Sequence, residues 1–264
     1  MPVRMRLAAT VLFVTLAVTP AFAVSGQAPP ASGFAARPIV MLIDNRGDLC
    51  TATALARDLV LTAAHCVVIP ATYRVRVFQN GAMVDVGKIR RHPGFNMANY
   101  KASRATADVA LVKLKGPLPD MVMPAALAAP RRVEVGETLT IAGFGVTQAG
   151  TAHGLGVPRM ASLVVTGRPG SLQIRLQDPE TKNERAGLGG CTGDSGAPAF
   201  DGAAPTDSGQ EDTKAAGKII GVVSWSTAPK SEEGCGGLTG LTPLLNYRDW
   251  IVTTAAALGS PLAP

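Results

Sequence analysis

The strongest constraint on the fold is a series of short β-forming runs that recur along the chain with turns between them. The sequence has 29 glycines and 20 prolines, whereas aromatic residues make up only 5% of it. Frequent turn formers between short apolar runs favour strands over a helical bundle. The runs form two sets, residues 38–43, 58–62, 73–78, 82–89 and 109–114, and residues 137–142, 161–166, 171–176, 197–200, 218–224 and 240–244. They predict an all-β sandwich or barrel architecture in two halves.

Two segments stand outside these sets. The stretch 116–130 is rich in proline and alanine without a clean period, and it indicates a connection between the halves. Near the end, Tyr247, Trp250 and Ile251 follow a helical spacing and predict a C-terminal helix. The expected division is 24–117 for the N-terminal half, 118–133 for the connection, 134–244 for the C-terminal half and 245–264 for the helix and tail.

The first residues have the pattern of a secretory signal peptide, expected over 1–23. Arg4 and Arg6 precede an apolar run, and Ala21-Phe22-Ala23 forms a cleavage site. The alternative is an uncleaved anchor helix, but the run is shorter than the roughly 20 residues that span a bilayer. No later segment is long and apolar enough, so the mature protein is expected to be secreted or periplasmic, without a membrane span.

Charge and cysteine content limit the partners. Loss of Arg4 and Arg6 lowers the formal net charge by two, from +6 to +4. No basic run interleaves with aromatic residues, so no nucleic acid partner is expected. The four cysteines of an exported chain predict two disulfides, for which three pairings are possible. No cysteine and histidine cluster has zinc spacing, and we expect neither a metal nor a cofactor.

The segment Gly189-Gly190-Cys191-Thr192-Gly193-Asp194-Ser195-Gly196-Ala197-Pro198 presents a candidate nucleophile. Glycines allow positive φ angles and let a substrate approach the backbone closely. A serine that merely forms a turn is the alternative interpretation. A serine hydroxyl is a weak nucleophile and needs a base to take its proton.

Two upstream segments supply a base and a carboxylate. Imidazole titrates near neutral pH, and His65 follows Thr62-Ala63-Ala64 next to a cysteine. The other histidines, His92 and His153, lie in a turn and in a glycine-rich loop without such a setting. Asp108 begins a buried strand, where an unpaired charge would be costly.

The three segments, in the order His65, Asp108, Ser195, resemble the trypsin/chymotrypsin family of serine proteases, as a secreted member of the bacterial type. The resemblance extends from about residue 37 to the C-terminal helix. It implies two antiparallel six-stranded β-barrels with the active site between them and a C-terminal α-helix. It also implies that His65, Asp108 and Ser195 form the catalytic triad and that the N–H groups of Gly193 and Ser195 form the oxyanion hole. The disulfides implied are Cys50–Cys66 and Cys191–Cys235.

The resemblance also suggests a specificity that differs from that of trypsin. Members that cleave after basic residues have an aspartate at the position of Gly189, and a second carboxylate is sometimes found at that of Gly240. Ser226 stands where glycine is usual and would narrow the entrance. We therefore expect a small or medium apolar residue before the cleaved bond. The expected pocket residues are Gly189, Gly190, Thr192, Ser224, Trp225, Ser226 and Gly240.

Activation raises a separate question, which concerns Asp194. In the family this aspartate pairs with a newly formed α-amino terminus, but the usual Ile-Val-Gly-Gly start is absent here. Signal cleavage after Ala23 would expose Val24-Ser25-Gly26. The hypothesis is that Val24 is the activating terminus; the alternative is that residues 24–36 are a flexible leader and Asp194 has another partner.

The expected function is that of an exported, monomeric serine endopeptidase that acts on proteins or peptides through an acyl-enzyme. A catalytically inactive relative that binds a partner through the same fold is the alternative, since fold alone does not guarantee activity. An α/β-hydrolase esterase is disfavoured, because its acid and histidine follow the serine in the chain.

Overall fold

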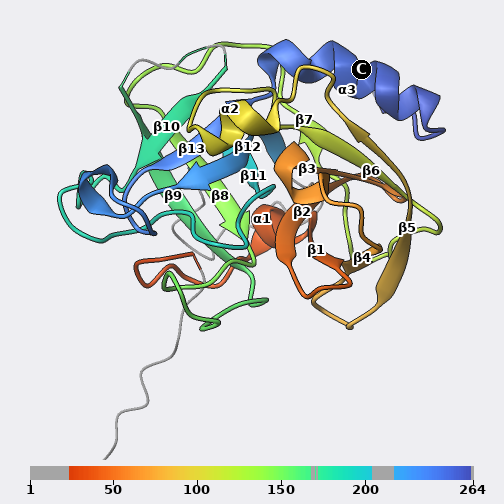
Figure 1. Ribbon diagram of the computed structural model, residues 1–264, viewed down its shortest axis with the longest axis horizontal. Helices are drawn as coiled ribbons and strands as arrows, with labels where there is room; N and C mark the ends of the chain where they lie inside the picture. Colours follow the sequence, from red (N-terminus) through yellow and green to blue (C-terminus); the bar gives the residue numbers. More distant parts are fainter. Residues whose placement is uncertain (1–23, 168–169, 171, 204–216, 263–264) are drawn as a thin grey trace, which may run out of the picture.

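Two closed six-stranded antiparallel β-barrels and a C-terminal helix make up the described part of the chain (Figure 1). The computed structural model describes residues 24–167, 170, 172–203 and 217–262. The predicted signal peptide, 1–23, lies outside these residues. The expected two-barrel fold is confirmed.

The first barrel carries the candidate histidine and aspartate. Its strands run in the spatial order β1-β2-β3-β6-β5-β4 and are β1 (Ile39–Asp44), β2 (Leu49–Ala56), β3 (Leu59–Thr62), β4 (Tyr73–Arg76), β5 (Met83–Arg91) and β6 (Ala110–Leu114). The interior contains Val40, Val60, Val75 and Val112, all fully buried. β-Branched residues pack well on a pleated surface, and all five predicted runs here correspond to strands that contain them.

The second barrel carries the candidate nucleophile. Its strands follow the order β11-β8-β9-β10-β13-β12, and pairing of β11 with β12 closes it. They are β8 (Thr138–Gly143), β9 (Arg159–Thr166), β10 (Ile174–Gln177), β11 (Pro198–Asp201), β12 (Lys218–Ser226) and β13 (Thr239–Pro243). A short strand, β7 (Ala126–Leu127), lies on the segment between the barrels and pairs in parallel with β12.

A shared apolar cluster joins the two barrels and the C-terminal helix. It contains Leu61 and Leu111 of the first barrel, Phe144 and Phe200 of the second, and Ile251 of the helix. Because this core is continuous, the loops at the barrel interface have a fixed support on both sides.

The helical elements are short, except at the C-terminus. They are α1 (Gly33–Ala36), the 3₁₀ turn η1 (Ala64–Val67), α2 (Met97–Lys101), the 3₁₀ turns η2 (Pro229–Ser231) and η3 (Leu245–Tyr247), and α3 (Arg248–Ala257). The predicted C-terminal helix is thus present, although its first residues form a 3₁₀ turn. In the described residues no helix has the length and hydropathy needed to cross a membrane.

Candidate active site

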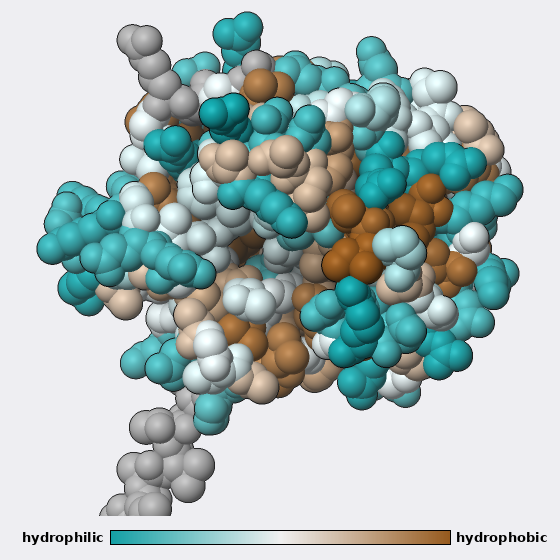
Figure 2. All heavy atoms as spheres, viewed as in Figure 1, coloured by the Kyte–Doolittle hydropathy of each residue, from teal (hydrophilic) through white to brown (hydrophobic). Residues whose placement is uncertain are grey.

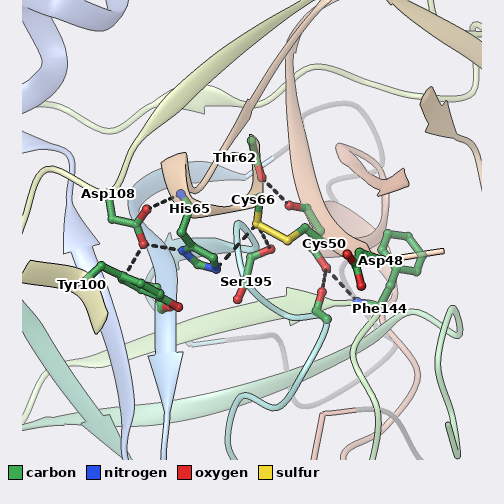
Figure 3. The surroundings of a disulfide bond; sticks show 12 residues. Asp48, Cys50, Thr62, His65, Cys66, Tyr100, Asp108, Phe144 and Ser195 are labelled. Atoms are coloured by element: carbon green, nitrogen blue, oxygen red, sulfur yellow. Dashed lines mark hydrogen bonds and ion pairs between the residues drawn. A yellow bond between two sulfur atoms is a disulfide. The ribbon is translucent and has the colours of Figure 1, made fainter. Parts of the chain in front are cut away.

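His65 and Asp108 lie side by side because strands β3 and β6 pair, with Thr62 opposite Ala110. His65 follows β3 in η1, and Asp108 comes just before β6. The Asp108 carboxylate lies 2.7 Å from His65 Nδ1 through Oδ2 and accepts the His65 backbone N–H at 2.9 Å through Oδ1 (Figure 3). Asp108 is 1% exposed. These two contacts fix the plane of the imidazole and direct Nε2 away from the carboxylate.

The second barrel also contributes a hydrogen bond to the Asp108 carboxylate. Ser224, on β12, donates a hydrogen bond from its hydroxyl to Asp108 Oδ2 at 2.5 Å. Ser224 is among the predicted pocket residues, but in the structure its side chain is buried against the carboxylate. The hydroxyl therefore links the two barrels behind the histidine.

Tyr100, on α2, covers one face of the imidazole and is absent from the predicted site. Its ring is stacked on that of His65, with centroids 4.4 Å apart and planes inclined by 16°. The phenol O–H donates to the Ser224 carbonyl at 3.3 Å. Burial, with a smaller effect of the Asp108 charge, raises the pKa of Tyr100 to about 12, so the phenol stays neutral.

Ser195 lies on the tight turn that enters β11. A Cβ on the next residue, Gly196, would lie 2.1 Å from Thr62 Oγ1, and its φ is +84°, so only glycine fits there. Cys66 Sγ lies 3.7 Å from His65 Nε2 and 3.8 Å from the Ser195 carbonyl oxygen. Cys66 Sγ thus lies near both the His65 imidazole and the Ser195 backbone, as Figure 3 shows. Ser195 Oγ makes no hydrogen bond to any described residue and is available to a substrate.

The turn before Ser195 is held from the first barrel. Thr51, on β2, donates from Oγ1 to the Gly193 carbonyl at 2.9 Å, and its backbone N–H donates to the Ser195 carbonyl at 2.9 Å. Gly193 has φ +96°. Within the described residues, the N–H groups of Gly193 and Ser195 make no hydrogen bond, so both are free to bind a ligand oxygen.

Asp194 is fully buried, and the structure gives it no cationic partner among the described residues. Its carboxylate accepts the N–H groups of Gly145 and Cys191, each at 2.9 Å. A Cβ on Gly143 would lie 2.2 Å from Asp194 Oδ1, so glycine is required where the backbone passes the carboxylate. Burial raises the pKa of Asp194 to about 7, although the two hydrogen bonds act in the opposite direction.

Residues 24–26 lie beside the loop that leads to Ser195. Val24 is fully buried in the core of the second barrel. The Ser25 N–H donates to the Gly189 carbonyl at 3.0 Å. Gly26 has φ +84°, and a Cβ there would lie 2.3 Å from the carbonyl carbon of Gly187. This segment therefore packs against the loop that carries the expected pocket residues.

Thr239, on β13, packs against Gly189 and Gly190. The Gly190 N–H donates to Thr239 Oγ1 at 2.8 Å, and a Cβ on Gly189 would lie 3.3 Å from the same oxygen. Gly240 instead lies against the Trp225 indole. A Cβ placed on Gly240 would lie 1.9 Å from Trp225 Cε2. Thr239 is missing from the predicted pocket because its position depends on the pairing of β12 with β13, in which Ser226 is opposite Thr239.

Two other expected pocket residues, Trp225 and Ser226, lie on β12, which pairs with β13. Trp225 and Ser226 line an open cavity of about 860 Å³ together with Tyr100. The Ser226 hydroxyl donates to the Gly234 carbonyl at 3.3 Å. Thr192 is exposed. The loop is fastened by the disulfide Cys191–Cys235, and a second disulfide joins Cys50 to Cys66.

One group of potential metal ligands occurs in the described residues. The ligand atoms of Cys50, His65 and Cys66 lie within 4.8 Å of one another. Both sulfurs belong to the disulfide, so neither is a thiolate, and thiolates are what a metal ion binds. This group is not a metal centre in the disulfide-bonded protein.

With this geometry, the comparisons with known proteins identify the class. The trypsin family model matches residues 24–251, and the chain belongs to the trypsin family of serine endopeptidases. Among curated relatives, snake venom serine protease rhinocerase 4 of Bitis rhinoceros is 26% identical over 228 residues, 81% of each chain. Thrombin-like enzyme CPI-enzyme 2 of Gloydius ussuriensis is 24% identical, again over 81% of each chain. Vitellin-degrading protease of Bombyx mori is 38% identical over 76 residues, 26% of this chain and 27% of the relative. These relatives are animal proteins and do not support the bacterial-type assignment.

Proposed function

We propose that this endopeptidase cleaves peptide bonds with Ser195 as nucleophile, His65 as general base and Asp108 as the group that orients His65. His65 Nε2 takes the proton of Ser195 Oγ as that oxygen attacks the peptide carbonyl. Asp108 stabilises the imidazolium that forms. The N–H groups of Gly193 and Ser195 bind the oxyanion, and His65 then protonates the leaving amine. The paired contacts of Asp108 with the His65 ring and backbone are the observation that carries this proposal.

Covalent labelling with a fluorophosphonate tests the nucleophile. The protein with Val24 as its first residue should be labelled, and Ser195→Ala should not. Ser32→Ala, which changes an exposed serine at the start of α1, is the matched control and should be labelled normally. Labelling that persists in Ser195→Ala would overturn the assignment. A folded wild type that resists labelling would instead favour the inactive, partner-binding alternative.

We propose further that the enzyme prefers a small or medium apolar residue before the cleaved bond. Gly189 supplies no charge for a basic side chain, and the Thr239 side chain occupies space at the base of the pocket. Ser226 narrows the same region. Digestion of a peptide library should show cleavage after residues such as Ala or Val, and Thr239→Gly should extend it to larger apolar residues. Wild-type cleavage after Lys or Arg would contradict the proposal.

We propose that Val24 is the activating terminus. In a chain that still carries earlier residues, the Val24 nitrogen is an uncharged amide, whereas its release creates a cation for the buried Asp194 carboxylate. Support comes from the burial of Val24, the pairing of Ser25 with Gly189 and the start of the family match at residue 24. Sequencing of the active protein should give Val24 first. Full activity with residues retained ahead of Val24 would refute it.

The proposed setting is extracellular or periplasmic, with residues 1–23 removed on export. Two disulfides suit an oxidising compartment. We propose a monomer that acts on peptide substrates and does not bind nucleic acid. Mass measurement of the exported protein tests the cleavage site, and its size in solution tests the monomer.

A further inference from the structure

The Cys50–Cys66 disulfide lies against the candidate catalytic histidine. The ligand atoms of these two cysteines and of His65 lie within 4.8 Å of one another, and Cys66 Sγ is 3.7 Å from His65 Nε2. Figure 3 shows the disulfide beside the imidazole. Neither sulfur is a thiolate while the disulfide is intact, but its reduction creates two soft ligands next to an imidazole, a combination that suits zinc.

The spacing of these atoms fits a tetrahedral zinc site. Zinc binds imidazole nitrogen at about 2.0 Å and thiolate sulfur at about 2.3 Å, which places the two ligand atoms about 3.5 Å apart. The observed 3.7 Å between His65 Nε2 and Cys66 Sγ is close to this value. The Cα atoms of Cys50 and Cys66 are 6.3 Å apart, so rotation of the side chains is enough to separate the sulfurs once the bond between them is broken.

The histidine is already oriented as metal-binding histidines are. Its Nδ1 lies 2.7 Å from Asp108 Oδ2, and a carboxylate in this position fixes the tautomer in which Nε2 has the free lone pair. The Ser224 hydroxyl holds the same carboxylate, and the Tyr100 ring covers one face of the imidazole. The groups that prepare His65 to take a proton therefore also prepare it to bind a metal ion.

A pocket of about 180 Å³, which we call the pocket at Ile69, gives access to these atoms. His65, Cys50, Cys66 and Ile69 are among the residues that line it. Both of these cysteines are partly exposed, whereas Cys191 of the other disulfide is buried. Figure 2 shows that the molecule is hollowed near the middle of the face seen in Figure 1. A small reductant and a metal ion can therefore reach the Cys50–Cys66 pair, with water as the fourth zinc ligand.

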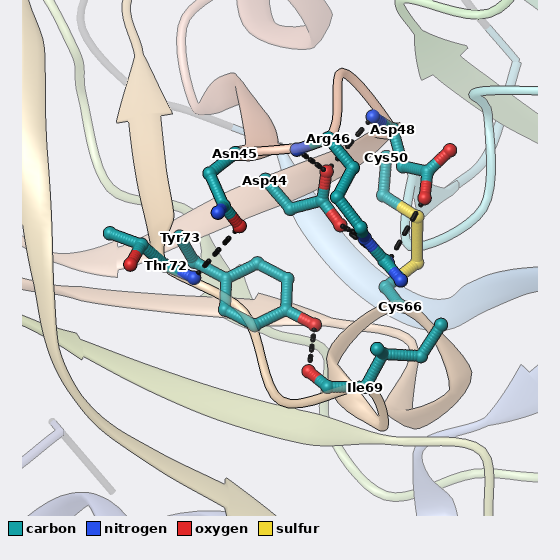
Figure 4. A network of polar contacts seen from close by, with 9 residues as sticks. All are labelled: Asp44, Asn45, Arg46, Asp48, Cys50, Cys66, Ile69, Thr72 and Tyr73. Carbon is teal, nitrogen blue, oxygen red and sulfur yellow. Dashed lines mark hydrogen bonds and ion pairs between the residues drawn. A yellow bond between two sulfur atoms is a disulfide. The ribbon is translucent and has the colours of Figure 1, made fainter.

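The charged groups that line the pocket favour a cation (Figure 4). Asp44 and Asp48 share the guanidinium of Arg46, at 2.6 and 3.1 Å. Because two carboxylates face one guanidinium, these three side chains carry a net negative charge beside the disulfide. A pocket lined by charge of one sign concentrates ions of the opposite sign, so this charge favours the approach of a divalent cation.

We propose that the protein with a reduced Cys50–Cys66 pair binds one Zn²⁺ ion through both thiolates and His65 Nε2, and that the bound zinc inactivates it. The zinc site does not depend on the proposed function, whereas the inactivation rests on it. The bond to zinc uses the lone pair of Nε2 that would otherwise take the proton of Ser195 Oγ. A molecule that has lost this disulfide is then held inactive by zinc.

A trialkylphosphine supplies the reduction that the experiment needs. The phosphine takes an oxygen atom from water and is oxidised to its oxide, while the disulfide gains two electrons and two protons and becomes two thiols. Each thiol gives its proton to the buffer when its sulfur binds Zn²⁺. A phosphine is chosen over a dithiol because thiolates themselves bind zinc.

Metal content tests the site without reference to activity. After anaerobic removal of the phosphine, the reduced protein should retain one equivalent of Zn²⁺ on dialysis and the disulfide-bonded protein none. Co²⁺ in its place should give the strong visible absorption of tetrahedral thiolate coordination. Zinc should also slow alkylation of Cys50 and Cys66 by iodoacetamide, as located by peptide mass mapping. Protection only of Cys191 and Cys235 would overturn the inference.

Three variants localise the zinc, with affinity measured by competition with a chromogenic chelator. Asp108→Asn should weaken binding by about 10–100-fold, the usual effect of losing the partner of a metal-binding histidine. His65→Ala, which removes a ligand, should weaken it further. His153→Ala is the matched control, since it removes an exposed histidine outside the pocket, and it should bind zinc as the wild type does.

The inference is overturned if His65→Ala binds zinc as tightly as the wild type. It is also overturned if the reduced wild type takes up no zinc, or if circular dichroism shows it unfolded in the presence of zinc. Either result means that the folded chain does not form the site.

Fluorophosphonate labelling separates this inference from the proposed function. Zinc should slow labelling of the reduced protein by about 100-fold, the scale of a general base, and EDTA should restore it. Bound zinc with unchanged labelling would overturn the inactivation. A disulfide-bonded wild type that resists labelling would instead contradict the proposed function, and the metal content would still decide the zinc site.

Discussion

Asp194 is a buried carboxyl whose ionisation should lower the stability of the unprocessed chain. Burial raises the pKa of Asp194 to about 7 in the folded state, against 3.8 for an exposed aspartate, so the folded state holds the proton more tightly. This contribution to stability is therefore full below about pH 4 and is lost as the pH rises towards 7. The loss is on the order of 4 kcal/mol, at 1.36 kcal/mol per pKa unit.

We expect Asp194→Asn to flatten this dependence in a chain with residues ahead of Val24. Urea unfolding at pH 5 and pH 8 measures it: the unprocessed wild type should lose more stability than the variant between the two values. Under the proposal for Val24, the α-amino group of the form that begins at that residue compensates the carboxylate, and Asp194→Asn should destabilise this form at pH 8. Identical pH profiles of wild type and variant in both forms would contradict the assignment.

Tyr100 is expected to position His65 and to stabilise its charged form. Loss of the stacked ring in Tyr100→Leu removes a cation–π contact worth about 1–2 kcal/mol, so kcat should fall by about tenfold. Tyr100→Phe keeps the ring and should retain most of the activity. The rate of fluorophosphonate labelling should fall in parallel in Tyr100→Leu, since that reagent has no peptide chain. A change confined to KM would make Tyr100 a substrate contact only.

Among the elements, helix α3 fastens the C-terminus to both barrels. Ile251 is fully buried in the cluster that joins them. Beyond the helix, Ser260 donates to Asp58, and Lys113 pairs with the same carboxylate at 2.5 Å. The helix therefore packs on the apolar cluster where the two barrels join.

Truncation of Ile251 should destabilise the whole molecule. Ile251→Ala is expected to lower the free energy of unfolding by about 2–5 kcal/mol, the usual cost of a buried cavity. Thr253→Ala, an exposed position of the same helix, should change it by less than about 0.5 kcal/mol. Chemical denaturation of both variants makes the comparison, and equal effects would argue against the role of the helix.

The elements also show which features a sequence can reveal. The segments around His65, Asp108 and Ser195 are local patterns, so each could be recognised without knowing its neighbours. Strand β2 is absent from the predicted runs because its alanines have little strand preference, and burial between β1 and β3 holds it in place. Thr239 and the pocket at Ile69 depend on strand register and on segments far apart in the chain. Such features follow from tertiary pairing rather than from local pattern.

On the scale of the whole molecule, Thr51 connects the first barrel to the turn of the second barrel that carries Gly193 and Ser195. Its Oγ1 donates to Gly193 and accepts the Phe144 N–H at 3.0 Å. Thr53, two residues along the same strand, is equally buried, but its hydroxyl has no hydrogen-bond partner in the described residues. Strand β2 thus contains two equally buried threonines, and only the hydroxyl of Thr51 is hydrogen-bonded within the described residues.

We expect Thr51→Val to reduce both kcat and stability, and Thr53→Val to reduce neither. The first leaves two buried backbone groups without partners, at about 1–3 kcal/mol each, and frees the turn that carries Gly193. The second replaces an unpaired hydroxyl with a methyl group of similar size. Steady-state kinetics and thermal unfolding distinguish them, and a similar outcome for both would refute this connection.

The seating of residues 24–26 has a practical consequence for anyone who makes this protein. Gly26 has no room for a side chain, and Ser25 is hydrogen-bonded to Gly189. Under the proposal for Val24, an affinity tag or fusion partner ahead of these residues would give a folded but inactive protein. Pro261, after α3, is exposed, so such a handle belongs at the C-terminal end.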